Sequence, residues 1–149
     1  MRALLDTNLI LDLFLGREGA EFTGVILDSV DDGKISGFIS WHSITDAYHV
    51  FKKDEGVKQD VPVAQDRNDL ARDKLADLLS RLSIPATGDK DFETALSFDC
   101  KDFEDSLIIA AAACCDAQYI VTRDEKHFKN SPIPPILPRD FCQQVAALY

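Results

Sequence analysis

The sequence Arg-Ala-Leu-Leu-Asp occupies residues 2–6, where three consecutive apolar residues end at a carboxylate. A short apolar run of this kind predicts a buried strand, and the helical spacing of apolar residues from Asn8 to Leu15 predicts a helix directly after it. A second apolar run, Gln118 to Thr122, is followed in the same way by Arg123 and Asp124. Both runs are therefore predicted to be strands, each followed by an aspartate.

Strands and helices alternate along the remaining chain. Further strands are predicted at Gly37–Trp41, at Leu82–Pro85 (weak) and at Ile136–Leu137 (short). Helices are predicted at Ser43–Lys53, Asn68–Leu82, Asp91–Phe98, Phe103–Cys115 and Arg139–Ala147. This alternation predicts βαβ units, hence an α/β fold in which helices flank a parallel sheet. The helix at 103–115 is apolar nearly all round, so it is predicted to be central.

Length and charge limit the classes of function. A chain of 149 residues is predicted to form one domain, 1–149, with a polar insertion around 54–77 whose first part, 54–66, is a loop. The 16 Lys and Arg against 26 Asp and Glu give a net charge of −10. A chain this acidic has no general electrostatic attraction for nucleic acid or anionic membrane. A polyanionic substrate must therefore be held by a local basic patch or through metal ions.

The sequence predicts a cytoplasmic protein without membrane association. No apolar run approaches the roughly 20 residues of a membrane span, and Asp6 interrupts the start too early for a signal peptide. The cysteines, Cys100, Cys114, Cys115 and Cys142, show no CxxC spacing. They are predicted to be free thiols, with the vicinal pair buried in its Ala-rich segment.

Carboxylates at the predicted sheet edge are the main functional signal. Ligands of open parallel sheets bind at the carboxyl ends of the strands, where Asp6 and Asp124 are predicted to lie. Two such charges on neighbouring strands repel each other, and a divalent cation such as Mg²⁺, which prefers oxygen ligands, removes the conflict. Asp46 and Asp105, each in the first turn of a predicted helix, add two further candidates.

Each of these acids also has a simpler explanation. Ser43–Asp46 and Asp102–Asp105 have the spacing of capping boxes, in which an acid satisfies free helix amides. The signal therefore lies in the four acids together. It is strengthened by the net charge of −5 over residues 89–105, which is unusual for a plain solvated face.

Other candidates receive structural interpretations. The three histidines, His42, His49 and His127, share no metal-ligand spacing and are predicted to be exposed or satisfied by neighbours. Trp41 is predicted to lie in the core rather than to stack on a nucleobase. Asp12, one helical turn beyond Asn8, is predicted to be a surface or capping residue.

Four motifs, in this order, resemble those of PIN-domain nucleases. They are Leu-Leu-Asp-Thr-Asn at 4–8, Ser-Ile-Thr-Asp-Ala-Tyr at 43–48, Asp-Phe-Glu-Asp at 102–105 and Ile-Val-Thr-Arg-Asp at 120–124. The resemblance runs from Ala3 to about Val145, and it is closest to the bacterial branch that includes the toxins of VapBC-type toxin–antitoxin modules. It implies a three-layer α/β/α sandwich with a central, mainly parallel sheet. It also implies an endoribonuclease site that depends on Mg²⁺ or Mn²⁺.

The resemblance assigns roles to particular residues. The residues it implies to be catalytic and metal-binding are Asp6, Asp46, Asp105 and Asp124. Asp46 stands where many family members have the longer Glu. Asn8 and Thr122 match the polar positions that orient the acids, and Glu104 is a supporting neighbour whose role stays open.

The implied reaction is hydrolysis of an RNA phosphodiester by a metal-activated water. The residues predicted to contact the RNA backbone are Lys52, Lys53, Arg123 and Lys126, with His127 and Lys129 beside them. As a toxin, the protein would need an antitoxin partner, whose basic side chain would enter the acidic site. Family members often form homodimers, so a homodimer is a further implied partner state.

Two alternatives stay open from the sequence. The first is a catalytically silent PIN-like module that binds RNA or protein, which the shorter Asp46 and the acidic composition leave open. The second is a haloacid-dehalogenase-type phosphatase, which also carries an Asp after its first strand. That site needs another Asp two residues later, where this chain has Asn8.

Overall fold

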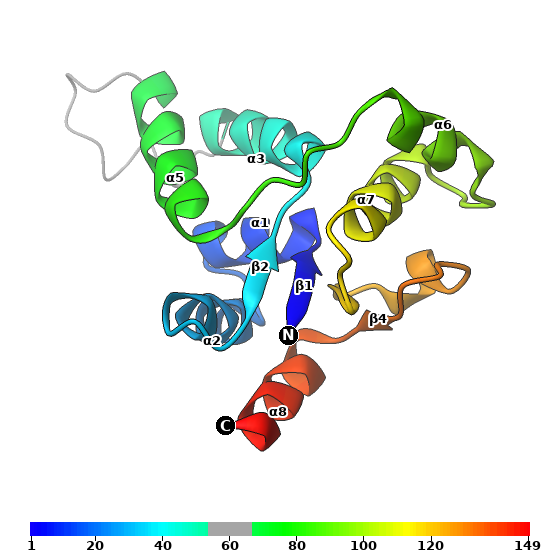
Figure 1. Ribbon diagram of the computed structural model, residues 1–149. Coiled ribbons are helices and arrows are strands. Elements are labelled where there is room, and N and C mark those ends of the chain that lie inside the picture. Colours follow the sequence, from blue (N-terminus) through cyan, green and yellow to red (C-terminus); the bar gives the residue numbers. More distant parts are fainter. Residues whose placement is uncertain (54–66) are drawn as a thin grey trace.

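The computed structural model describes residues 1–53 and 67–149, and the loop predicted at 54–66 lies outside the described residues. The described strands form one parallel sheet in the order β2-β1-β3-β4 (Figure 1). The strands are β1 (Arg2–Leu5), β2 (Ser36–Phe38), β3 (Tyr119–Val121) and β4 (Pro135–Ile136). The first strand of the chain is therefore interior. Leu4 is in register with Phe38 of β2 on one side and with Ile120 of β3 on the other.

The helices cover both faces of this sheet. Successive side chains of a strand point to opposite faces, and those of β1 enter two different hydrophobic clusters. Ala3 and Leu5 pack with α1 (Thr7–Leu15), α2 (Ala20–Asp31), α3 (Trp41–Lys53), α5 (Arg67–Arg81) and α8 (Pro138–Leu148). Leu4 packs on the opposite face with α7 (Phe103–Cys114), against which α6 (Asp89–Ser97) lies. The predicted α/β/α sandwich and the central apolar helix are thus confirmed.

One predicted strand is wrong, and one helix was not predicted. The strand expected at Leu82–Pro85 is only an isolated parallel bridge between Ser83 and Phe38, and Pro85 has no N–H with which to extend it. Helix α2, which brings Ile26 and Leu27 into the core, had no predicted counterpart. Gly24 lies inside this helix, where glycine has low propensity and weakens the sequence signal.

The cysteines are free, as predicted, but they are not all buried. Cys115 is buried, and burial raises the pKa of its thiol to about 11. Cys114 is exposed at the last turn of α7, so the prediction of a buried vicinal pair is half wrong. Of the helices in the described ranges, none has both the length and the apolar character needed to cross a membrane.

Candidate active site

The site begins where β1 ends. Because β1 and β3 are parallel neighbours, their carboxyl ends meet, and the amide of Asp6 donates a hydrogen bond to the carbonyl of Val121 at 3.0 Å. The Asp6 carboxylate is buried, with the residue 5% exposed. Its Oδ2 accepts hydrogen bonds from Thr122 Oγ1 at 2.8 Å and from Asn8 Nδ2 at 3.3 Å. Burial raises the pKa of Asp6, and the hydrogen bond from Thr122 opposes that rise.

Thr122 connects this carboxylate to the next one. Its fully buried hydroxyl donates to Asp6 and accepts a hydrogen bond from the amide of Asp124 at 3.0 Å. Asp124 then precedes the short 3-10 helix η1 (Glu125–Phe128), and its side chain is 44% exposed. One hydroxyl thus fixes a buried acid at β1 and a half-exposed acid just beyond β3.

A third acid, Asp105, joins from the first turn of α7. The imidazole of His127 lies between it and Asp124, with Nδ1 3.4 Å from Asp105 Oδ2 and Nε2 3.1 Å from Asp124 Oδ2. Burial, followed by the charges of Asp102, Asp6 and Glu104, raises the pKa of Asp105 to about 6, while His127 opposes the rise. Three acids from separate parts of the chain therefore lie in one network. Thr122 connects Asp6 to Asp124, and His127 lies between Asp124 and Asp105.

The sequence predicted His127 beside the RNA contacts but not between two of the acids, because the three histidines share no metal-ligand spacing. The missed signal is local, since His127 follows Asp124 by three residues within η1 and therefore points back toward it. It also lines a hollow of about 500 Å³ together with Asp105, Lys126 and Lys129. Acids and lysines thus lie on the same concave surface.

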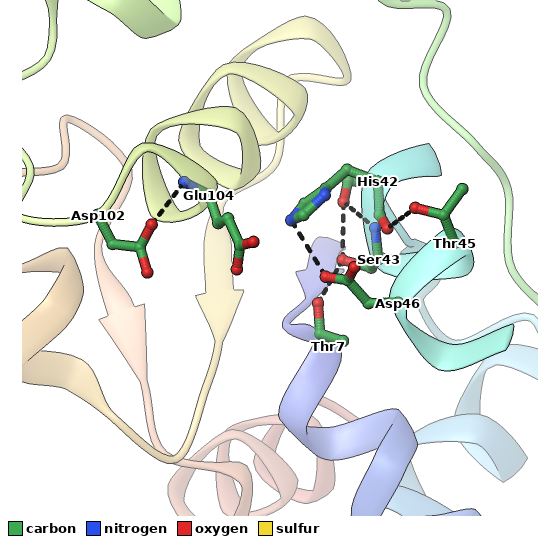
Figure 2. A network of polar contacts seen from close by, with 8 residues as sticks. Thr7, His42, Ser43, Thr45, Asp46, Asp102 and Glu104 are labelled. Carbon is green, nitrogen blue, oxygen red and sulfur yellow. Dashed lines mark hydrogen bonds and ion pairs between the residues drawn. The ribbon is translucent and has the colours of Figure 1, made fainter. Parts of the chain in front are cut away.

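The fourth predicted acid, Asp46, belongs to a neighbouring cluster (Figure 2). Its Oδ2 lies 3.4 Å from His42 Nε2, one helical turn earlier in α3. Within the described residues, His42, Asp46 and Glu104 are the group of three ligating side chains whose ligand atoms lie within 4.8 Å of one another. Asp6, Asp105 and Asp124 do not form such a group there. The four predicted acids therefore divide between two adjoining clusters.

One hydrogen bond and one pair of sequence neighbours connect the helices that carry the two clusters. Thr7, the residue after Asp6, donates from Oγ1 to Ser43 Oγ at 2.6 Å, which ties the start of α1 to the start of α3 (Figure 2). On the other side, Glu104 of the second cluster is adjacent in sequence to Asp105 of the first. The beginnings of α1, α3 and α7 therefore meet beside the carboxyl end of β1.

Among the described hydrogen bonds, neither Asp46 nor Asp105 caps its helix as the third residue of a capping box; Asp102 caps α7 instead. Helix α3 begins at Trp41, two residues earlier than predicted, and the amide of Ser43 is satisfied by Ser40 Oγ at 3.1 Å. Asp46 therefore does not occupy the third position of a capping box. In α7, Asp102 is the N-cap and accepts a hydrogen bond from the amide of Glu104 at 3.0 Å.

Two further predictions are wrong. Trp41 is 53% exposed rather than in the core, because it is the first residue of α3; with Phe92 it lines a small apolar pocket. Asp12 is 2% exposed rather than on the surface, and its Oδ2 lies 3.0 Å from Arg123 Nε. The two residues meet because α1 follows β1 and Arg123 follows the adjacent β3.

The predicted RNA contacts are distributed unevenly. Lys126 lines two hollows, one together with Asp105 and the other together with Asn8 and Asp124. Arg123 is engaged by Asp12, although 45% of its side chain is exposed. Lys52 and Lys53 lie in the last turn of α3, where the Lys52 ammonium stands 5.9 Å from the ring centre of Tyr48.

If Asp105 is a metal ligand, as the sequence predicts, its raised pKa should make metal affinity depend on pH. Below about pH 6 the carboxyl holds a proton that a cation must displace, and above it the carboxylate is free. Affinity for Mn²⁺ is therefore expected to increase about tenfold from pH 5 to pH 7, measured by isothermal titration calorimetry.

In the metal-free protein, the same raised pKa of Asp105 predicts a free energy of unfolding that falls as pH rises from about 4 to 6, because the native state holds the proton more tightly than the unfolded state.

The control for the prediction on Mn²⁺ affinity is Asp105→Asn, which removes the titrating group. The variant should bind Mn²⁺ more weakly and with a flatter dependence on pH. An affinity of the unmodified protein that is equal at pH 5 and pH 7 would contradict the assignment of Asp105 as a ligand.

A family profile for the PIN domain matches residues 2–126. Among solved structures, VapBC2 from Rickettsia felis bound to a DNA fragment from its promoter is 17% identical, with 92% of this chain and 98% of that chain covered and a TM-score of 0.63. FitAcB from Neisseria gonorrhoeae is 18% identical, with coverages of 92% and 98% and a TM-score of 0.59. VapBC-1 from nontypeable Haemophilus influenzae is 14% identical, with coverages of 93% and 99% and a TM-score of 0.62. No curated protein matches significantly in sequence.

Proposed function

The chain belongs to the PIN-domain family, and from this premise we propose that it is a metal-dependent endoribonuclease. The proposed catalytic and metal-binding residues are Asp6, Asp105 and Asp124, with Asp46 as the fourth acid. Asn8, Thr122 and Glu104 support them. The match to the PIN domain, together with Asn8 in place of a second Asp, argues against a haloacid-dehalogenase-type phosphatase.

The observation that carries the proposal is the uncompensated charge at the end of β1. Asp6 and Asp105 are both shielded from water, and burial raises the pKa of each. Neither has a Lys or Arg partner in the described part of the chain, where the imidazole of His127 is the neighbour of Asp105. Buried carboxylates without such a partner suit a hard divalent ion, so the residues present fit Mg²⁺ or Mn²⁺. A bound ion would supply positive charge for a phosphate oxygen and lower the pKa of a coordinated water.

The chain's own residues have distinct proposed roles. Thr122 and Asn8 hold Asp6 in one orientation, and the first turn of α7 presents Asp105 toward it. His127, when protonated, offsets the charges of Asp105 and Asp124 at its two ring nitrogens. Hydrogen-bond donors to metal-binding side chains fix the orientation of those side chains, and their loss usually weakens metal affinity or activity by about 10- to 100-fold.

RNA would be held by local basic groups, because the chain as a whole is strongly acidic. Lys126 and Lys129 line the hollow that contains Asp105 and are the best-placed phosphate contacts. Contacts from Lys52, Lys53 and Arg123 stay predictions, and the ion pair of Arg123 with Asp12 competes with a contact to RNA.

We also propose a protein partner of the antitoxin type. The similar solved structures are described as VapBC and FitAB assemblies, two of them bound to DNA. In such a pair, a basic side chain of the antitoxin would enter the acidic site of this chain. A homodimer and a cytoplasmic location stay predictions.

Cleavage of RNA with and without metal tests the proposed function. The full chain, freed of metal by EDTA and supplied with Mn²⁺, should cleave at least one of several structured RNAs, followed by gel electrophoresis. Excess EDTA should reduce cleavage to background and weaken RNA binding, since the acids then repel phosphate. Undiminished cleavage in EDTA would contradict metal dependence. Binding of RNA without cleavage of any substrate would favour the catalytically silent module.

A further inference from the structure

The cluster of His42, Asp46 and Glu104 differs in chemistry from the acids around Asp6. It brings one imidazole nitrogen and two carboxylates together from α3 and α7, with all three ligand atoms within 4.8 Å of one another. Figure 2 shows the Glu104 side chain extending from α7 toward the His42–Asp46 pair on α3. We infer that these three residues form a binding site for a first-row transition-metal ion such as Zn²⁺ or Mn²⁺.

The distance within the pair supports this inference. His42 Nε2 and Asp46 Oδ2 are 3.4 Å apart, which exceeds the roughly 2.7–2.9 Å of a charge-assisted hydrogen bond. Two ligand atoms that each lie about 2.1 Å from one tetrahedral ion are themselves separated by about 3.4 Å. The pair is therefore spaced as two ligands of a common ion rather than as a close ion pair.

The scaffold holds this pair in position. His42 and Asp46 are four residues apart on α3, so they lie on the same face of the helix. The start of α3 is fixed by Ser43, which bonds to Ser40 Oγ at 2.7 Å and to Thr7 Oγ1 at 2.6 Å. The imidazole is also largely shielded, with a side chain that is 16% exposed.

The charges of the cluster are not balanced by other residues. In the described ranges, neither Asp46 nor Glu104 has a Lys or Arg within ion-pairing distance, and Asp46 contacts the imidazole of His42. Three protein ligands, one of them nitrogen, leave further positions of an ion open to water or substrate, as in catalytic zinc sites. Imidazole suits Zn²⁺, whereas Mg²⁺ and Mn²⁺ prefer oxygen ligands, Mg²⁺ most strictly.

This inference rests in part on the proposed function, because Asp46 is also proposed to serve the nuclease site. The inference specifies which metal ion the site prefers. It predicts a preference for Zn²⁺ that the oxygen ligands Asp6, Asp105 and Asp124 alone would not produce. A site completed by His42 should bind Zn²⁺ more tightly than Mn²⁺, and Mn²⁺ more tightly than Mg²⁺.

Metal binding by the full chain, without RNA, tests the inference. Zn²⁺ and Mg²⁺ are titrated separately into EDTA-dialysed protein by calorimetry, with reduced thiols, and the unmodified chain is compared with His42→Gln. Loss of a ligand is expected to weaken Zn²⁺ binding at least 100-fold while Mg²⁺ affinity changes less than twofold. The matched control is His49→Gln, an exposed histidine on the same helix, which should leave both affinities unchanged.

A second variant, Glu104→Gln, keeps the inference falsifiable if His42→Gln fails to fold by circular dichroism. It should weaken Zn²⁺ binding at least tenfold, because a ligand from α7 is lost. Zn²⁺ affinity that is unchanged in either folded variant would overturn the inference. If the protein cleaves RNA with Mg²⁺ but these variants bind Zn²⁺ as tightly as the unmodified chain, the zinc site is wrong and the proposed nuclease function stands. If the variants lose Zn²⁺ binding but the unmodified chain cleaves no RNA, the zinc site stands and the proposed nuclease function is wrong.

Discussion

Replacing Asp6 with Asn is expected to reduce RNA cleavage by on the order of 10³-fold or more, the scale of loss when a central catalytic group is removed. Asp6 is the most buried of the four acids and receives hydrogen bonds from Thr122 and Asn8. An amide keeps the shape of the side chain but removes the negative charge that would attract a divalent ion. Initial rates of RNA cleavage at saturating Mn²⁺ measure this loss.

The same substitution is expected to leave the fold intact. Burial disfavours the charged form of Asp6 and raises its pKa, so a neutral amide at this position relieves a cost in the metal-free protein. The Asn oxygen can still accept the hydrogen bond from Thr122. The melting temperature without metal should therefore be equal to or above that of the unmodified chain, measured by circular dichroism.

A matched control is Asp32→Asn, an exposed acid at the end of α2 that pairs with Lys34. It removes the same charge far from the strand edge and should leave the cleavage rate unchanged. Cleavage by Asp6→Asn at the rate of the control, with trace nuclease excluded, would remove Asp6 from the proposed site.

Replacing Arg123 with Ala is expected to lower the free energy of unfolding by about 3 kcal/mol. Removing one partner of a buried ion pair typically costs roughly 3–5 kcal/mol, since the remaining charge stays buried. Asp12 is 2% exposed and loses its 3.0 Å contact to Arg123, while Arg17 lies 3.9 Å away. The lower end of the range applies because the Arg123 side chain is itself 45% exposed. Urea denaturation followed by circular dichroism measures the change.

Arg139→Ala is the matched control, because its side chain is 69% exposed and its contact to Asp140 is 3.8 Å long. Such a surface pair is expected to contribute less than about 1 kcal/mol. In addition, Asp12→Asn combined with Arg123→Ala should recover part of the lost stability, since no unpaired charge is then buried. Equal effects of Arg123→Ala and Arg139→Ala would show that Arg123 is available for RNA rather than committed to Asp12.

The sequence predicted the parts of the fold that depend on local pattern. The apolar runs before Asp6 and Asp124 are strands, and the helix at 103–115 is central, because a run that is apolar on all sides must be covered. Helix α2 was not predicted because Gly24 in its interior weakens the local pattern. The strand predicted at Leu82–Pro85 is reduced to one bridge from Ser83 to Phe38, because Pro85 cannot donate the hydrogen bond that would extend it.

Part of the candidate site could also be predicted from the sequence. Asp6 and Asp124 follow their strands in the sequence, so their proximity could be inferred from a parallel sheet alone. The contacts of His42 and His127 were missed, although each histidine lies three or four residues from an acid that it contacts. That spacing indicates a contact only when the helix or 3-10 turn around it is known. Asp12 was misjudged because its counterion, Arg123, is 111 residues away and becomes its neighbour only when β1 pairs with β3.

The interior position of β1 has a consequence for folding. Residues 2–5 of β1 pair with β3 at Tyr119–Val121, far along the sequence. Sheets with such distant pairing form late, because the long intervening segment must be closed first. A fragment of this sequence that stops before Asp124 would lack one of the four acids of the proposed site. Such a fragment is therefore expected not to assemble that site.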